Sequence, residues 1–227
     1  MISRMRLIAD SLPEDDGVRA FTTVYQRVTE AIRDRLGTGF FADDRFVEIL
    51  DVVFAGRFLA AVDSSIDSSI DTAPTGHPVN RAWRPLFVAR ADPRIHAVQF
   101  VVAGMNAHIN FDLSLAVVDA CTAEHVDPDT GSVAEDYDRV NDVLESIESA
   151  VRNSLLHDLE LQLGQPLEPL VHLISSWSIA NAREAAWVRA KVLWQLRHIG
   201  PLFDQAVDIS ASAVGMTSRQ LLTPLLE

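Results

Sequence analysis

The chain has 227 residues, of which 48% are hydrophobic, and a formal net charge of −13 from 32 acidic and 19 basic side chains. An acidic surface repels phosphate backbones and anionic bilayers, so the composition argues against nucleic-acid and membrane partners. The single cysteine, Cys121, excludes an intramolecular disulfide and a four-cysteine zinc site. We find no signal peptide and no run of roughly 18 uncharged apolar residues that would span a bilayer, and we expect a cytoplasmic protein.

Helical periodicity begins near the N-terminus. Hydrophobic residues recur every three or four positions over residues 18–36, which predicts an amphipathic helix with an aspartate cap. A second helix is predicted over about 44–63, and because it is apolar on nearly all sides we expect it to lie centrally. Asp51 would then be a charged residue in a largely buried helix. Residues 64–79 are rich in Ser, Asp and Pro, which predicts a long loop of the kind that can form a lid.

The rest of the chain also favours helices. They are predicted over residues 80–88, 93–124 (one long helix or a helix pair), 133–161, 170–198, 201–214 and 217–222. Turn-forming residues separate them, as in VDPDTG at 126–131 and GQPLEP at 164–169. No segment alternates with period two for long enough to predict a strand. We therefore predict an all-α fold, a single domain over residues 1–227 that is a bundle of about seven to eight helices.

The stretch GMNAHINFDLSLAVV, residues 104–118, places polar side chains in one of the most apolar parts of the chain. His108 and Asp112 are four residues apart, so they share one face of a helix. An imidazole nitrogen and a carboxylate oxygen that converge in this way suit a divalent metal such as zinc, iron or manganese. The alternative is a simple hydrogen bond between the two side chains. Gly104, one turn earlier, leaves a gap that a substrate or another helix could fill.

Other polar residues are candidates for the same site. Asp138, in the acidic stretch EDYDRVNDVLESIE, would complete the metal site, unless that stretch is only a solvated helix face. A buried Asp51 would be ion-paired, a metal ligand or a general base. Asn106 and Asn110 would either order His108 or tie neighbouring helices together.

The stretch SSWSIANAREAAWVRA, residues 175–190, contains a charged residue between two indoles. Trp177, Arg183 and Trp187 follow one another at helical spacing, which allows the guanidinium to stack on an indole ring. Such a stack is either structural, with Asp51 as a candidate ion-pair partner, or the wall of a pocket that binds an anion.

The segment AGMNAHINFDL resembles the AGMNAHIN-x-DL core motif of a bacterial, largely actinobacterial, helical domain family of unknown function. The stretches LDVVFAGRFLAA, VNDVL and WSIANAREAAW extend the resemblance over about residues 17–190. The resemblance implies a mostly helical fold and no established activity.

Together these residues favour a metal-dependent enzyme that acts on a small apolar molecule, by hydrolysis or by oxidation. We assign metal binding to His108, Asp112 and Asp138, and catalytic roles to Asp51, Asn106 and Arg183. The alternative is a non-catalytic helical module that binds a small molecule or a protein partner, and the sequence is compatible with a homo-oligomer. The pocket of a small-molecule-binding protein would be lined by Trp83, Phe100, Met105, Trp177 and Trp187.

Overall fold

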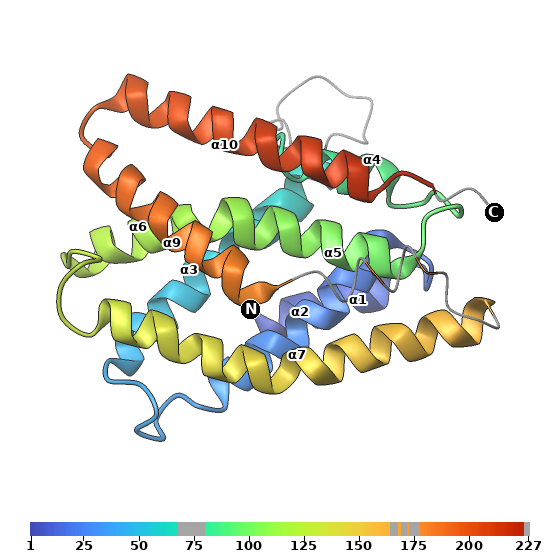
Figure 1. The fold of residues 1–227 in the computed structure, drawn as a ribbon, viewed down its shortest axis with the longest axis horizontal. Helices are drawn as coiled ribbons and strands as arrows, with labels where there is room; N and C mark the ends of the chain where they lie inside the picture. Colours follow the sequence, from blue (N-terminus) through green and yellow to red (C-terminus); the bar gives the residue numbers. More distant parts are fainter. Residues whose placement is uncertain (68–79, 164–167, 169–171, 173–177, 225–227) are drawn as a thin grey trace.

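The computed structural model describes residues 1–67, 80–163, 168, 172 and 178–224. Within these residues the regular elements are helices without a strand, which confirms the all-α prediction. Long helices run side by side in a bundle, with α10 along one edge and α7 along another (Figure 1). The bounds of the helices are α1 Ile2–Ser11, α2 Gly17–Arg33, α3 Asp44–Asp67, α4 Arg84–Ala89, α5 Ala97–Ala107, α6 Leu113–Glu124, α7 Val133–Leu163, α9 Ile179–Leu196 and α10 Gly200–Leu221.

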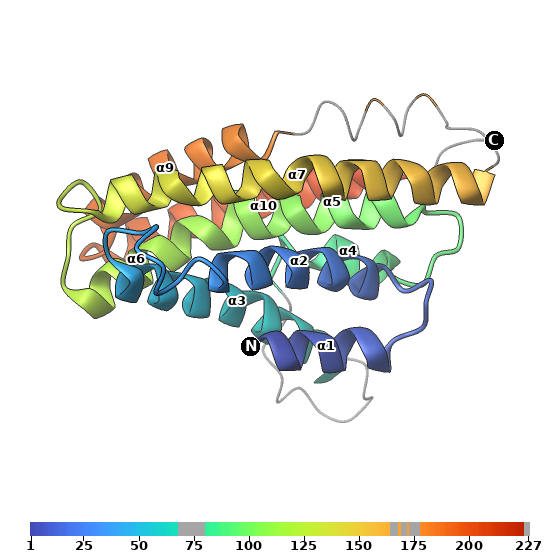
Figure 2. The same cartoon turned by 90° about the horizontal axis from the view of Figure 1, so that it is seen from below.

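A single rod forms the centre of the bundle. It consists of α5, a short π-helix over His108–Asp112 and α6, and most of its residues are buried. Helices α2 and α10 pack against α5, whereas α3 and α9 pack against α6 (Figure 2). The run Ala97–Glu124 is long and apolar enough to cross a bilayer, contrary to our expectation, but 89% of its most apolar window is buried by these neighbours. The surrounding helices therefore account for its hydrophobicity.

The N-terminal helix α1 was not predicted from the sequence. Only Met5 and Ala9 on this helix are buried, and two positions are too few to give a periodic signal. The next helix, α2, begins as predicted, because Asp16 Oδ1 accepts hydrogen bonds from the main-chain N–H groups of Val18 (2.8 Å) and Arg19 (3.3 Å).

Four predicted boundaries were wrong. The helix α3 continues to Asp67, so residues 64–67 are not loop, while residues 68–79 lie outside the described part of the chain. The predicted start at Pro93 is too early, because α5 begins at Ala97 after an extended His96. The predicted helix over 170–198 does not run through Ser178, which has extended backbone and caps α9 through the N–H of Asn181. Finally, α10 is one helix, with Gly215 inside it.

Gly104 marks a close approach of α5 to α2. A Cβ atom at this position would overlap the ring of Phe21, so a second helix fills the gap that the glycine leaves. Gly56 in α3 is also helical, but it is exposed and nothing lies within 4 Å of the Cβ position. The two glycines therefore separate the effect of packing from that of helix propensity.

We predict that Gly104→Ala lowers the free energy of unfolding by about 1–3 kcal/mol, because the new methyl group forces Phe21 out of its packed position. Gly56→Ala should raise it by roughly 0.5–1 kcal/mol, because alanine favours the helix over glycine. Urea denaturation followed by circular dichroism measures both. Equal effects of the two substitutions would contradict the close α2–α5 contact.

Candidate functional site

His108 and Asp112 bind each other at the centre of the rod. The Nδ1 atom of His108 lies 3.1 Å from Oδ2 of Asp112, and both residues are buried. The same carboxylate oxygen accepts a hydrogen bond from Nε1–H of Trp83 at 2.8 Å. Two donors therefore share one oxygen of a buried carboxylate, which compensates part of the cost of removing its charge from water.

The local backbone is a π-helix, a form that is frequent at functional sites. The N–H group of Leu113 donates to the carbonyl of His108, five residues earlier, instead of four as in an α-helix. The wider turn holds one additional residue and sets the positions of His108 and Asp112 relative to the helices on either side. The sequence gives no signal for it, because HINFD would also form an ordinary helical turn.

Burial sets the protonation state of His108, and the hydrogen bond to Asp112 sets its tautomer. Burial lowers the pKa of His108, and this effect exceeds the opposite one of Asp112, so the imidazole is neutral near pH 7. We assign the single ring proton to Nδ1, because Asp112 accepts it. The Nε2 atom then carries a free lone pair, and it is buried without a hydrogen-bond partner in the described structure.

Aromatic rings hold the imidazole in place. Phe54 stacks on it with a centroid distance of 3.6 Å and an interplanar angle of 3°, and Tyr25 meets it edge-on at 4.4 Å. These contacts and the bond to Asp112 leave little freedom for the ring to turn. The orientation of Nε2 is therefore set by the fold.

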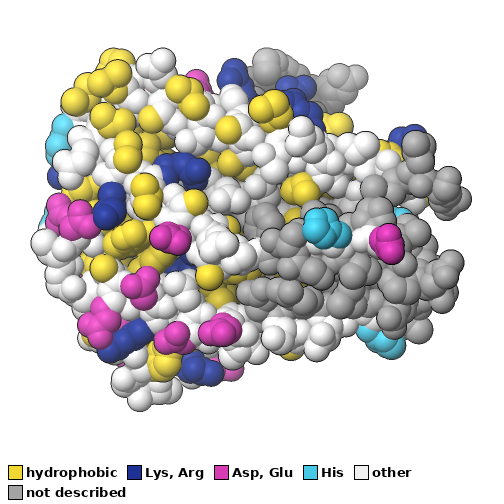
Figure 3. All heavy atoms as spheres, viewed as in Figure 1, with side chains coloured by type: hydrophobic (Ala, Val, Ile, Leu, Met, Phe, Trp, Pro, Cys, Tyr) yellow, Lys and Arg dark blue, Asp and Glu magenta, His cyan; other side chains and the backbone are white. Residues whose placement is uncertain are grey.

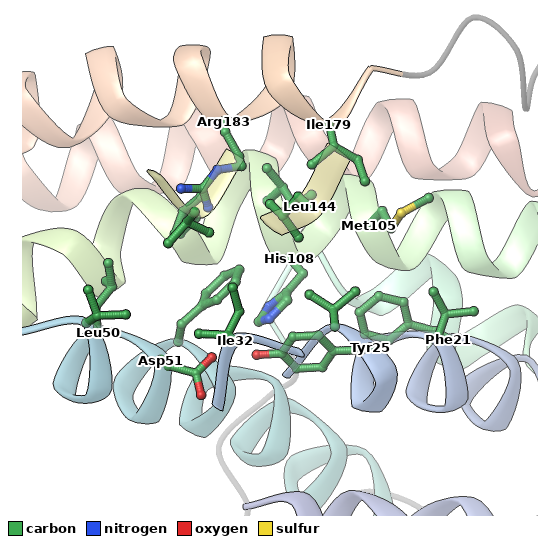
Figure 4. A pocket seen from close by; sticks show the side chains of 17 residues that line it. Phe21, Tyr25, Ile32, Leu50, Asp51, Met105, His108, Leu144, Ile179 and Arg183 are labelled. Atoms are coloured by element: carbon green, nitrogen blue, oxygen red, sulfur yellow. The ribbon is translucent and has the colours of Figure 1, made fainter. Parts of the chain in front are cut away.

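A cavity of about 90 Å³ lies next to the histidine. Its wall comes from α2, α3, the central rod, α7 and α9, and most of the lining side chains are apolar (Figure 4). The residues are Phe21, Val24, Tyr25, Val28, Ile32, Val47, Leu50, Asp51, Phe54, Met105, His108, Ile109, Leu113, Val140, Leu144, Ile179 and Arg183. This space exceeds what one water needs but is smaller than the roughly 300–1,000 Å³ of most ligand pockets, so it suits only a molecule of a few heavy atoms.

Two further polar groups join His108 in the cavity wall. The hydroxyl of Tyr25 is buried and has no hydrogen-bond partner in the described residues. Asp51 forms no hydrogen bond or ion pair there, and desolvation raises the pKa of its carboxyl group to about 7 although the amino terminus acts in the opposite direction. Burial, and next the charge of Asp51, raise the pKa of Tyr25. Figure 4 shows the Tyr25 hydroxyl pointing to the space between His108 and Asp51.

The predicted site residues separate into two groups. Asp51, His108 and Arg183 line the cavity, but Arg183 is tied to the wall through Nε–H to Asn141 Oδ1 (2.6 Å) and Nη2–H to the carbonyl of Tyr137 (2.8 Å). Its guanidinium lies over the ring of Tyr137 at 4.2 Å. The cation–π partner is thus a tyrosine of α7, not Trp187, and Trp177 lies outside the described residues.

The other candidates do not line the cavity. Asp138 is exposed on α7. The side-chain nitrogen of Asn106 donates to the carbonyl of Val214 and to Ser218 Oγ on α10, and Asn110 donates to Asn106. These asparagines therefore tie α5 and the π-helix to α10, which is the structural role that the sequence left open.

The described residues contain no group of three or more His, Cys, Asp or Glu side chains that could hold a metal ion. His108 and Asp112 direct their polar atoms at each other instead of at a common point, and Asp138 does not approach them. A metal at Nε2 would therefore need donors other than those we assigned from the sequence.

Sequence reasoning missed the groups that complete the site. Tyr25 was counted only as one apolar position of α2, and Phe54 as one of many hydrophobic residues of α3. Trp83 was expected in a pocket wall, yet it holds Asp112, and of the four predicted pocket residues in the described part of the chain only Met105 lines the cavity. A polar atom on an otherwise apolar stripe, as in Tyr25, is the signal that could have found the site.

Comparisons with known proteins add a family but no activity. Residues 1–224 match the model of a family that is described as a family of unknown function, DUF5995. No curated protein and no solved structure matches the chain.

We predict that Asp51→Asn stabilises the protein at pH 8 but not at pH 4. The folded pKa of about 7 lies above the unfolded value, so the wild type loses stability as the pH rises from about 4 to 7, whereas the asparagine variant does not. The difference should reach a few kcal/mol, since one pKa unit corresponds to about 1.4 kcal/mol.

Denaturant titrations at both pH values measure this difference. The control is Asp204→Asn, which removes an exposed carboxylate on α10. If the difference between Asp51→Asn and the wild type is the same at pH 4 and pH 8, Asp51 is not desolvated as the structure places it.

Proposed function

Because the chain belongs to the DUF5995 family of unknown function, we propose a function from the cavity itself: an enzyme that removes a proton from a small, largely apolar carbonyl compound. The observation that carries this proposal is the unpartnered Nε2 atom of His108, a base that Asp112 holds through the other ring nitrogen on a residue lining an apolar cavity. A neutral imidazole that is oriented through its other nitrogen is well suited to general base catalysis.

The first step is a proton transfer from carbon to nitrogen. Nε2 of His108 takes a proton from the carbon next to the carbonyl group, and the electron pair of the broken C–H bond moves to the carbonyl oxygen. The imidazole becomes positively charged, and Asp112 stabilises this charge through Nδ1–H. The donor Trp83 holds the carboxylate of Asp112 in position during this change.

The negative charge that develops on the carbonyl oxygen needs hydrogen-bond donors. The hydroxyl of Tyr25 stays protonated, because burial and the charge of Asp51 raise its pKa more than the nearby side chain of Thr29 lowers it, and it forms no hydrogen bond of ordinary geometry in the described residues. Asp51 is partly protonated near neutral pH and can serve as a second donor. An apolar site that keeps a carboxylic acid neutral so that it donates to an oxyanion is an established device for this chemistry.

The catalytic cycle is completed without a co-reactant. The proton on Nε2 returns to the same carbon, which exchanges hydrogen with solvent, or to another carbon of the enolate, which isomerises the molecule. The mainly apolar wall selects a hydrocarbon body, the two donors Tyr25 and Asp51 bind its single carbonyl group, and Nε2 of His108 faces the neighbouring carbon.

Two alternatives remain proposals beside this one. In a non-catalytic binding protein, Nε2 and the Tyr25 hydroxyl would only hold a ligand. In the metal-dependent enzyme that the sequence favours, Nε2 of His108 and the carboxylate of Asp51 would bind the metal ion. Asp112 would orient the imidazole through its bond to Nδ1. We also propose that AGMNAHIN is the signature of the family and that the family is bacterial.

We predict that the protein accelerates hydrogen–deuterium exchange at the carbon next to the carbonyl of acetone or butanone, which are small enough for the cavity. In D₂O, one NMR sample reports binding through saturation transfer and exchange through the loss of that proton signal. His108→Gln should reduce the exchange rate by about 100-fold or more, since it removes the base. His157→Gln, on the exposed face of α7, is the matched control and should have no effect.

The outcomes separate the alternatives. Tyr25→Phe should slow exchange while the ketone still binds, because it removes a donor to the oxyanion but keeps the ring. Binding without exchange in the wild type would leave a binding protein and overturn the catalytic proposal. Exchange that needs added zinc, iron or manganese would favour the metal-dependent alternative. Circular dichroism checks that each variant is folded.

A further inference from the structure

A second concave site lies on the surface between α4 and α10, away from the cavity. Its volume is about 660 Å³, and it shares no described lining residue with the cavity. The described residues that line it are Arg81, Arg84, Pro85, Val88, Ala89, Ser212, Arg219 and Leu222. Figure 3 shows Lys and Arg side chains gathered at the edge of the molecule where α10 passes α4. We call this site the arginine groove.

The three arginines of the groove differ from most others in the protein. Most of the other described arginines bind carboxylates, as Arg90 binds Asp16, or main-chain and amide oxygens, as Arg183 does. Arg84 and Arg219 have no such partner in the part of the chain that the structure describes, and Arg81 donates only to the neutral hydroxyl of Ser212 at 3.0 Å.

This placement is unexpected in a chain with a net charge of −13. Acidic side chains outnumber basic ones, yet no carboxylate is among the described residues of the groove. Three guanidinium groups around one concave surface repel one another unless an anion lies between them. Because no described carboxylate balances these three positive charges, we expect an anionic ligand to do so.

The groove is built on a rigid backbone. Asn80 Oδ1 accepts hydrogen bonds from the main-chain N–H groups of Ala82 (3.0 Å) and Trp83 (3.2 Å), which fixes the turn that carries Arg81 and Arg84. Gly215 of α10 packs directly on the carbonyl of Arg81, and a Cβ atom there would overlap that oxygen. Because the positions of α4 and α10 are set before a ligand arrives, little ordering of the backbone opposes binding.

Apolar side chains complete the surface. Pro85, Val88, Ala89 and Leu222 line the groove beside the arginines, and Val88 is 77% exposed. An anion with a hydrocarbon part can contact both kinds of side chain. Guanidinium groups match the several oxygens of a phosphate better than those of a halide, since each phosphate oxygen accepts charge-assisted hydrogen bonds.

We propose that the arginine groove binds a phosphate monoester with an apolar substituent. Arg84 and Arg219 donate to the phosphate oxygens, Arg81 is oriented beside them by Ser212, and the substituent lies on Val88 and Pro85. The same chemistry occurs in a small organic phosphate and in the head group of an anionic lipid, and the experiment distinguishes the two sources.

The test is calorimetric titration of the full chain with phenyl phosphate, with inorganic phosphate and with vesicles that contain phosphatidic acid. We expect phenyl phosphate to bind more tightly than inorganic phosphate. The double substitution Arg84→Gln with Arg219→Gln should weaken its binding by at least about tenfold, as expected for the loss of charge-assisted hydrogen bonds. Arg27→Gln is the matched control, because Arg27 is also exposed and without a partner but lies on α2.

Each outcome decides the proposal. Equal affinity of the double variant and the wild type would overturn it, as would the absence of heat with all three probes. Binding to vesicles but not to phenyl phosphate would support the groove and identify a lipid head group as the source. An equal loss of affinity in Arg27→Gln would show that only the overall charge matters and would overturn a specific site. Circular dichroism confirms that the variants are folded.

Discussion

The buried carboxylate of Asp112 is the constraint on which the centre of the molecule depends. A carboxylate in an apolar core is costly unless donors surround it, and here Trp83 and His108 both donate to one oxygen. Trp83 precedes α4, whereas His108 and Asp112 both belong to the central rod, so the bond from Trp83 joins segments that are 29 residues apart in the sequence. The cavity, the free nitrogen of His108 and the path of residues 80–84 all follow from this arrangement.

The same arrangement links the two faces of residues 81–84. Trp83 is fully buried and holds Asp112, whereas Arg81 and Arg84, on either side of it, are exposed and line the arginine groove. A short segment thus contributes to an internal site through its buried residues and to a surface site through the exposed residues at its two ends. Gly215 and Asn80 fix the backbone of this segment, which keeps both sets of side chains in place.

The sequence predicts the helices well where one stripe of apolar residues is long, as in α2, and poorly where packing is decided by a few contacts. It could not predict α1, which buries only two residues, or the continuous α10, because the close approach of Gly215 to Arg81 is a tertiary feature. Spacing alone was enough to pair His108 with Asp112. The spacing could not show that the two side chains bond each other, because the π-helix and the hydrogen bond from Trp83 depend on tertiary structure.

The π-helix also has a consequence for the history of the family. A single extra residue in an α-helix produces such a turn, and its loss would return the rod to regular helix while rotating α6 by about 100° relative to α5. The partners of α5 and α6 differ, so that rotation would misalign α3 and α9 with the rod. A relative that lacks one residue between His108 and Asp112 would keep the composition of the rod, but it would lose the geometry of the His108–Asp112 pair. A gap at this point in an alignment would therefore divide the family more sharply than any substitution nearby.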